Sequence, residues 1–179
     1  MLNKYQWAAI AAALFIPSIV LAAGRKITKP DNPMKNLAAF LLMLQYSEGT
    51  YGAYAYRILY GGKLFNSYNR HPNQPVTRWG ITSTAAGAYQ FLYKTWQALA
   101  KDLKLVDFTP AAQNKAAIEL IRGKAALTDV LHGKIADAIY KCRKLWASLP
   151  GSGYGQNEKS IEELLRFYVR AGGKLNTMS

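Results

Sequence analysis

The chain has 179 residues, of which 50% are hydrophobic and 12% aromatic, a composition that is typical of one folded domain and excludes a disordered or fibrous protein. The formal net charge of +13 favours contact with polyanions such as nucleic acid, anionic lipid or an acidic cell envelope. The basic residues are scattered and no nucleic-acid-binding motif accompanies them, so we expect no nucleic-acid partner. The single cysteine, Cys142, excludes an internal disulfide and is expected to be a small buried residue.

Residues 1–23 are typical of an export segment. Lys4 precedes an apolar run over residues 7–23 that is interrupted only around Pro17, the pattern of a positively charged start and a hydrophobic core. The run is short and rich in alanine, so it would hold a membrane weakly. Two fates stay open, which are cleavage after Ala22 by a signal peptidase and a membrane helix that is released later.

The polar residues 24–33 contain proline and glycine and are interpreted as a linker, which places the folded domain at residues 34–179. Asn32 can cap a helix and Pro33 can take its first position. Apolar residues then follow at helical spacing, so the sequence predicts a helix that ends at Glu48, just before a glycine.

A small β element is predicted after this helix. Alternating apolar residues in 56–60, the pair Gly61-Gly62 and two apolar residues at 64–65 are typical of a hairpin. Residues 69–79 hold two prolines and many polar groups and are predicted to form an irregular loop. Most of the remainder is predicted to be helical, over 84–103, 109–122, a short run around 127, 135–149 and 160–171. The domain is therefore expected to be α+β and mostly helical.

Glu48 is set apart from the other nine acidic residues, most of which lie in turns, in first helical turns or beside basic neighbours. It shares a helix stripe with Leu37, Leu41 and Leu44, so its side chain leaves an apolar face at the point where the helix ends. A carboxyl group partly removed from water should have a raised pKa, as a general acid near neutral pH requires. The spacing alone also allows a glutamate that is solvated by the following loop.

Other chemistries are disfavoured. His71 and His132 lie far apart, without a histidine or cysteine at ligand spacing, so we expect no metal and no cofactor. Serines such as Ser47 and Ser83 lack the motif of an activated nucleophile.

Two segments combine small residues with groups that can bind polar ligands. The first places small residues before Tyr89 and Gln90 at an expected helix start. The second is a glycine-rich loop that presents Tyr154 and Gln156. Aromatic faces and amides are suited to holding sugars, so these four residues are candidates for substrate binding. The alternative is that both segments are tight turns which only join helices.

At these positions the sequence resembles the lambda-type phage endolysins, a family of lytic transglycosylases. The resemblance extends over roughly residues 34–173 and rests on Ser47-Glu48-Gly49-Thr50, Gly61-Gly62-Lys63-Leu64-Phe65, His71-Pro72, residues 82–91, residues 146–150 and Tyr154-Gly155-Gln156. It implies a lysozyme-like α+β fold with a small β-hairpin lobe and a cleft between lobes. It also implies that Glu48 is the catalytic glutamate, and that the cleft is lined by Tyr89, Gln90, Tyr154 and Gln156.

The number of carboxylates bears on the expected reaction. A hydrolytic lysozyme normally uses two carboxylates that flank the glycosidic bond. No acidic residue occurs between Glu48 and Asp102, so the hairpin and loop expected to face Glu48 cannot supply a second one. A transglycosylase needs only one, because the 6-hydroxyl group of the muramyl sugar attacks the anomeric carbon. We therefore expect cleavage of the β-1,4 bond between N-acetylmuramic acid and N-acetylglucosamine, formation of 1,6-anhydromuramic acid and lysis of the host cell.

Two alternatives stay open. One is a hydrolytic muramidase of the same fold, in which Gln90 or a hydroxyl group places a water, and the other is a cell-wall-binding or nucleic-acid-binding module without catalysis. We expect a monomer whose partners are peptidoglycan glycan strands and, through residues 1–23, the inner membrane. That segment resembles the export or signal-arrest-release segments of other phage endolysins, so the enzyme is expected in the host periplasm, whether or not it is first tethered.

Overall fold

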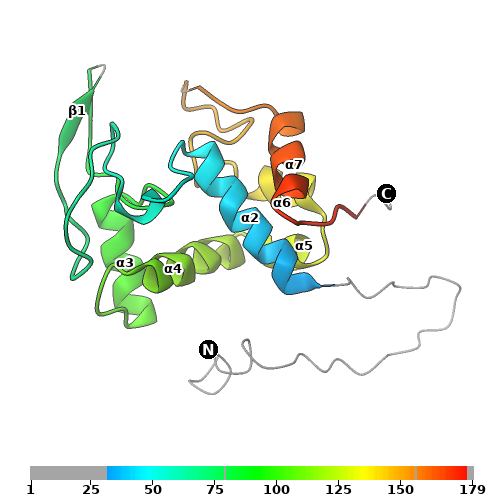
Figure 1. Ribbon diagram of the computed structural model, residues 1–179, viewed down its shortest axis with the longest axis horizontal. Helices are drawn as coiled ribbons and strands as arrows, with labels where there is room; N and C mark the ends of the chain where they lie inside the picture. The colour runs from blue at the N-terminus through cyan, green and yellow to red at the C-terminus, as the bar shows by residue number, and fades with distance from the viewer. Residues whose placement is uncertain (1–31, 79, 156, 177–179) are drawn as a thin grey trace, which may run out of the picture.

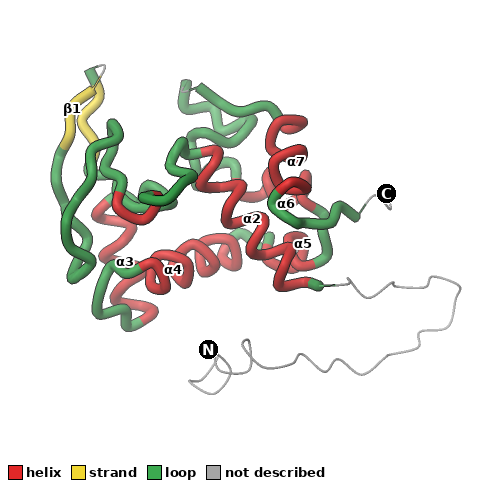
Figure 2. The backbone as a smooth tube through the Cα atoms, viewed as in Figure 1, coloured by secondary structure: helices red, strands yellow, loops and turns green. Residues whose placement is uncertain are grey.

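The structure, a computed structural model, describes residues 32–78, 80–155 and 157–176. The predicted export segment lies outside these residues, as does most of the predicted linker. Within the described ranges, no helix is both long enough and apolar enough to cross a membrane. Helices dominate and one two-stranded antiparallel sheet accompanies them, so the predicted α+β class is confirmed (Figures 1 and 2).

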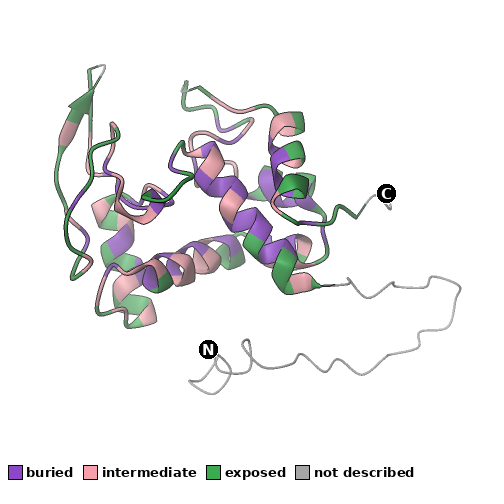
Figure 3. Ribbon diagram, viewed as in Figure 1, coloured by how far each residue is buried: buried purple, intermediate pink, exposed green. Residues whose placement is uncertain are grey.

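Helix α2 (Pro33–Ser47) lies between the sheet at one end of the molecule and helices α5, α6 and α7 at the other (Figure 1). Its predicted start is confirmed, because the side chain of Asn32 accepts a hydrogen bond from the N–H of Lys35 at 3.0 Å. Phe40 and Leu44 are fully buried in the core that α2 forms with α5 and α7. Buried residues run along most of α2 (Figure 3), and this packing holds the end of the helix that Glu48 follows.

The remaining helices begin largely where the sequence predicts. Thr109 caps α4 and Ser160 caps α7, each accepting a hydrogen bond from a main-chain N–H three residues later. The predicted helix over 135–149 is shorter than expected and ends at Cys142, after which residues 143–149 form turns. The helices are α3 (Tyr93–Leu103), α4 (Pro110–Gly123), α5 (Leu127–Leu131), α6 (Ile135–Cys142) and α7 (Ile161–Arg170).

The sheet lies later in the chain than predicted. Strands β1 (Val76–Arg78) and β2 (Ile81–Ser83) pair within and just after the segment that was expected to be an irregular loop. The hairpin predicted over 56–65 is reduced to an isolated bridge between Ile58 and Leu64. It cannot extend, because the residues before it coil into a 3-10 helix, Ala55–Arg57.

The helix predicted over 84–103 is wrong in its first half, since α3 begins only at Tyr93. Residues 84–92 fold as a compact loop in which Ala86 bridges to both Leu59 and Phe91. These bridges use the main-chain groups that a helix would pair internally. Tertiary pairing therefore overrides the helical pattern of this segment.

Gln113 of α4 holds this loop in place. Its Oε1 accepts the N–H of Ala88 at 2.9 Å, and its Nε2 donates to the carbonyl groups of Tyr56 and Phe108 at 3.0 and 2.8 Å. Gly87 has φ +78°, and a Cβ there would lie 2.2 Å from Oε1 of Gln113, so only glycine fits. One buried amide thus joins α4 to the loop at 84–92 and to the segment around Tyr56.

Candidate active site

Glu48 follows α2 directly and is held by main-chain contacts. Its N–H donates to the carbonyl of Leu44 at 2.9 Å, and Gly49, with φ +70°, then turns the chain away from the helix axis. The next residue, Thr50, is buried and its hydroxyl donates to the carbonyl of Ala88 at 2.6 Å. The end of α2 is thereby fixed to the loop at 84–92.

Ser148 is the hydrogen-bond partner of the Glu48 carboxyl group. Its hydroxyl donates to Oε1 of Glu48 and accepts a hydrogen bond from the hydroxyl of Ser47 at 2.7 Å. The carbonyl of Ser148 accepts the N–H of Lys159 at 2.9 Å, which fixes its main chain. Ser47 lies on α2 and Ser148 on the turns after α6, so the contact joins two segments that are far apart in the sequence.

Burial raises the pKa of Glu48 from its ordinary value of 4.5 to about 7, and the hydrogen bonds from Ser148 partly oppose this rise. The residue as a whole is partly exposed, so the carboxyl group lies largely out of water yet next to accessible space. No second carboxylate is among the causes of the shift. A carboxyl group with this pKa can hold a proton near neutral pH and can release it to a ligand.

The other acidic side chains of the described residues have structural positions. Glu163 pairs with Lys159 at 3.0 Å and accepts the hydroxyl of Tyr46. Asp102, Asp137 and Glu162 are exposed on helices. The remaining contacts are those of Asp107 with Thr109, Glu119 with Arg122, Asp129 with Lys141 and Glu158 with residues 151–153.

Tyr89 is 1% exposed, and its ring supports the site from inside. Its hydroxyl donates to Oδ1 of Asn114 at 2.6 Å, and its carbonyl accepts the indole N–H of Trp146 at 3.1 Å. Burial raises its pKa well above the ordinary value. In this structure the ring is part of the buried core, and the predicted contact of Tyr89 with substrate stays a prediction.

Gln90 is half-buried and adopts φ +46°. Its side-chain amide donates to the carbonyl groups of Ile58 at 3.1 Å and Gly87 at 3.0 Å. These bonds fix the amide across the loop and orient the residue. Its predicted roles, in binding substrate or placing a water, remain predictions.

The glycine-rich loop carries Tyr154, which is 57% exposed and whose hydroxyl donates to the carbonyl of Lys144 at 3.1 Å. The other predicted residue of this loop, Gln156, lies outside the described residues. The carboxylate of Glu158 accepts the N–H groups of Gly151 and Gly153 and the hydroxyl of Ser152. These bonds, led by that from Ser152, lower the pKa of Glu158 to about 2, so it stays ionised and holds the loop.

Sequence reasoning missed Ser148 and Glu158. Ser148 lies inside the motif over 146–150 that carried the family resemblance, but nothing in its spacing points to Glu48, which is 100 residues away. Glu158 had a readable signal, since an acidic residue just after a glycine-rich loop can accept several exposed N–H groups.

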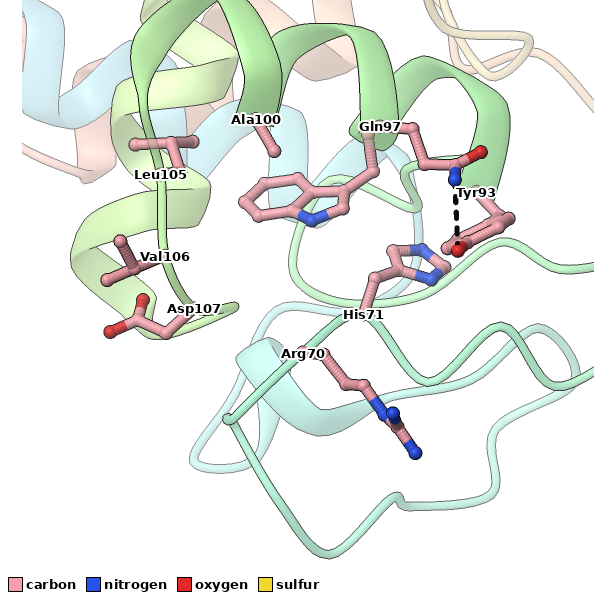
Figure 4. A pocket seen from close by; sticks show the side chains of 9 residues that line it. Arg70, His71, Tyr93, Gln97, Ala100, Leu105, Val106 and Asp107 are labelled. Carbon is pink, nitrogen blue, oxygen red and sulfur yellow. Dashed lines mark hydrogen bonds between the residues drawn. The ribbon is translucent and has the colours of Figure 1, made fainter.

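A pocket of about 310 Å³ lies beside α3, and the residues that line it do not include Glu48 or Ser148 (Figure 4). The ring of His71 lines it and is 3% exposed, with Nε2 donating to the carbonyl of Phe91 and Nδ1 accepting the N–H of Asn73. Burial lowers the pKa of His71, so the ring is neutral and structural. Among the described residues, no three His, Cys, Asp or Glu side chains gather to hold a metal ion.

A mostly helical fold with a small sheet and one protonatable glutamate at a helix end define a lysozyme-like domain. The model of the endolysin family matches residues 38–175. The chain is 43% identical to the endolysin of Escherichia phage P2, over 79% of this chain and 96% of that protein. It is 42% identical to the endolysin of Escherichia phage lambda, over 75% of this chain and 90% of that protein.

Solved structures agree with this. Bacteriophage lambda lysozyme complexed with a chitohexasaccharide has a TM-score of 0.77 at 40% identity, covering 79% of this chain and 97% of that one. A second structure of the lambda lysozyme has a TM-score of 0.73 at 38% identity, with the same coverage. The chain belongs to the endolysin family and is a peptidoglycan-degrading enzyme of the lambda lysozyme type.

Proposed function

We propose that the chain is a lytic transglycosylase that uses Glu48 as its only catalytic carboxylate. The observation that carries the proposal is a partly desolvated carboxyl group with a pKa of about 7, which accepts a hydrogen bond from Ser148. No second carboxylate is among the causes of this raised pKa. No acidic residue occurs from Gly49 to Lys101, the stretch that supplies β1, β2 and the loop at 84–92. None of these elements can therefore provide a second carboxylate, which supports the proposal.

The proposed reaction has two proton transfers. Protonated Glu48 gives its proton to the glycosidic oxygen while the bond from that oxygen to the anomeric carbon of the muramyl sugar breaks. The resulting carboxylate then accepts the proton of the 6-hydroxyl group as its oxygen bonds to the anomeric carbon. Glu48 ends in its starting state and no water is consumed. A pKa close to neutral suits both steps, because the group acts first as acid and then as base.

The ligand is proposed to be a peptidoglycan glycan strand. The solved lambda lysozyme binds a chitohexasaccharide, and the similarity of 40% identity supports a glycan ligand for this chain. The exposed ring of Tyr154 lies on the loop that follows Ser148 in the chain, which supports a contact with a sugar face there. Gln90 and Gln156 are proposed to add amide contacts to the sugars. Tyr89 is proposed to act mainly by supporting the site from inside.

The products of a digest test the proposal. Purified peptidoglycan is digested in water enriched in heavy oxygen, and the fragments are analysed by mass spectrometry. A transglycosylase gives anhydromuramyl ends that are lighter than the hydrolytic product by one water and carry no heavy oxygen. Reducing ends that contain heavy oxygen would establish a hydrolytic muramidase instead. Intact walls would favour a binding module.

Single replacement of Asp102, Asp107, Asp129 or Asp137 by Asn is expected to leave lytic activity within about tenfold of wild type, since none needs to contribute a catalytic factor of ~10² or more. In the structure Asp107 accepts the hydroxyl of Thr109 and Asp129 pairs with Lys141, while Asp102 and Asp137 are exposed on helices. Turbidity of purified cell walls gives the rate, and circular dichroism checks the fold. A folded variant as inactive as Glu48→Gln would identify a second catalytic carboxylate.

The enzyme is further proposed to reach the host periplasm through residues 1–23, either cleaved after Ala22 or first tethered to the inner membrane. A cell that expresses this chain alone should contain a membrane or periplasmic pool of it, because the segment has the charge and apolar pattern of an export signal. Fractionation and mass spectrometry of the mature N-terminus decide between the fates. A version that starts at Met34 is the control and should stay in the cytosol. A full-length product confined to the cytosol would contradict the proposal.

A further inference from the structure

We propose that Ser148 is a positioning residue. Its hydroxyl, oriented by Ser47, donates a hydrogen bond to Oε1 of Glu48, so that Oε2 is the oxygen that carries the catalytic proton. The inference rests on the proposed function, in which Glu48 acts first as acid and then as base. It assigns a role to a residue that does not itself touch the reacting atoms.

The order of donors in the hydrogen-bond chain carries the inference. The hydroxyl of Ser47 donates to Oγ of Ser148 at 2.7 Å, so the single proton of Ser148 points elsewhere, toward Oε1 of Glu48. An oxygen that accepts this bond is the poorer place for the acidic proton, because two hydrogens would then face each other. Protonation of Glu48 is thereby directed to Oε2.

The position of Ser148 is fixed from two sides. Its carbonyl accepts the N–H of Lys159, and its hydroxyl contacts the last turn of α2 through Ser47. Trp146, two residues earlier, is 4% exposed and donates its indole N–H to the carbonyl of Tyr89. The serine is thus held by hydrogen bonds of its own side chain and main chain before substrate arrives, as an effective positioning residue requires.

The same bond affects the acidity of Glu48. Burial raises its pKa, and a side-chain and a main-chain hydrogen bond from Ser148 both lower it, the side-chain bond more strongly, which leaves the value at about 7. Charged or titratable groups on the neighbouring elements are Tyr46 of α2, Lys159 before α7 and Glu163 of α7, and these bind one another. Glu158, next to Lys159 in the chain, accepts the hydroxyl of Ser152 in the glycine-rich loop. Ser148 is therefore the specific contact that opposes the effect of burial.

The test is the pH dependence of lytic activity in Ser148→Ala, Ser148→Thr and wild type, with the full chain and purified cell walls. Activity should fall as pH rises through the pKa of Glu48, because the acid form is lost. In Ser148→Ala we expect this fall to move to higher pH by about one unit, with a loss of about tenfold in maximal rate. Ser148→Thr keeps the hydroxyl and should restore the wild-type profile.

Ser67→Ala is the matched control, since Ser67 is exposed and only accepts the N–H of Asn69, and its profile should equal that of wild type. A Ser148→Ala enzyme that is slower but keeps the wild-type pH profile would overturn the inference and leave Ser148 a structural residue. An unchanged rate would overturn it as well. Failure of the proposed function is recognised separately, because the wild-type digest would then contain reducing ends with heavy oxygen, whatever the pH profile of Ser148→Ala.

Discussion

Glu48→Gln is expected to fold and to lose peptidoglycan-cleaving activity by a factor of ~10² or more. The amide keeps the size of the side chain and can still accept the hydrogen bond of Ser148, but it cannot deliver a proton to the glycosidic oxygen. The rate is measured as the loss of turbidity of purified cell walls, and soluble fragments are quantified by chromatography. Glu162→Gln, on the exposed first turn of α7, is the control and should be fully active.

The same variant should be more stable than wild type at alkaline pH, which separates lost catalysis from lost folding. The pKa of Glu48 is about 7 in the folded state and 4.5 ordinarily, so the folded protein binds the proton more tightly than the unfolded chain. Wild-type stability therefore falls as pH rises from 4.5 to about 7, and this loss is absent in the variant. Thermal unfolding at pH values on either side of this window measures the difference. A folded Glu48→Gln enzyme that lyses walls at the wild-type rate would refute the proposed mechanism.

The elements that the sequence predicts well are those with local signals. Asn32, Thr109 and Ser160 each cap a helix through their own side chains, so the start of the helix is encoded in adjacent residues. The placement of Glu48 at the end of an apolar stripe was equally local, and its raised pKa follows from burial that the stripe predicts. The catalytic candidate could therefore be found before the fold was known.

The misplaced elements are those that depend on partners far away in the chain. The loop at 84–92 has a helical pattern, but Ala88 is bonded to Gln113 and Ala86 to Leu59. Ser148 meets Glu48 only because the turns after α6 pack against the end of α2. The ring of Tyr89 is buried, and its hydroxyl donates to Asn114, 25 residues later in the chain. No pattern within one segment reports such contacts.

Gln113→Ala is expected to lower the free energy of unfolding by about 3 kcal/mol or more, because it removes three hydrogen bonds at once, two of them buried and one part-buried. The N–H of Ala88 and the carbonyl groups of Tyr56 and Phe108 would each lose a partner. Gln113 itself is fully buried, so solvent does not reach its side-chain amide in the native packing. Denaturant unfolding followed by circular dichroism measures the loss.

Gln113→Met separates the hydrogen bonds from the space that the side chain fills. Methionine has a similar length and no amide. If unpaired polar groups dominate, Gln113→Met should therefore lose nearly as much stability as Gln113→Ala. Gln97→Ala is the control, since Gln97 is exposed and donates only to the hydroxyl of Tyr93, and its effect should stay within about 0.5 kcal/mol. Near-wild-type stability of Gln113→Met would mean that packing, and not the amide, joins α4 to the loop beneath the active site. The expected large loss would instead identify this one side chain as the polar contact that holds Ala88, and through Thr50 the end of α2, in position for Glu48.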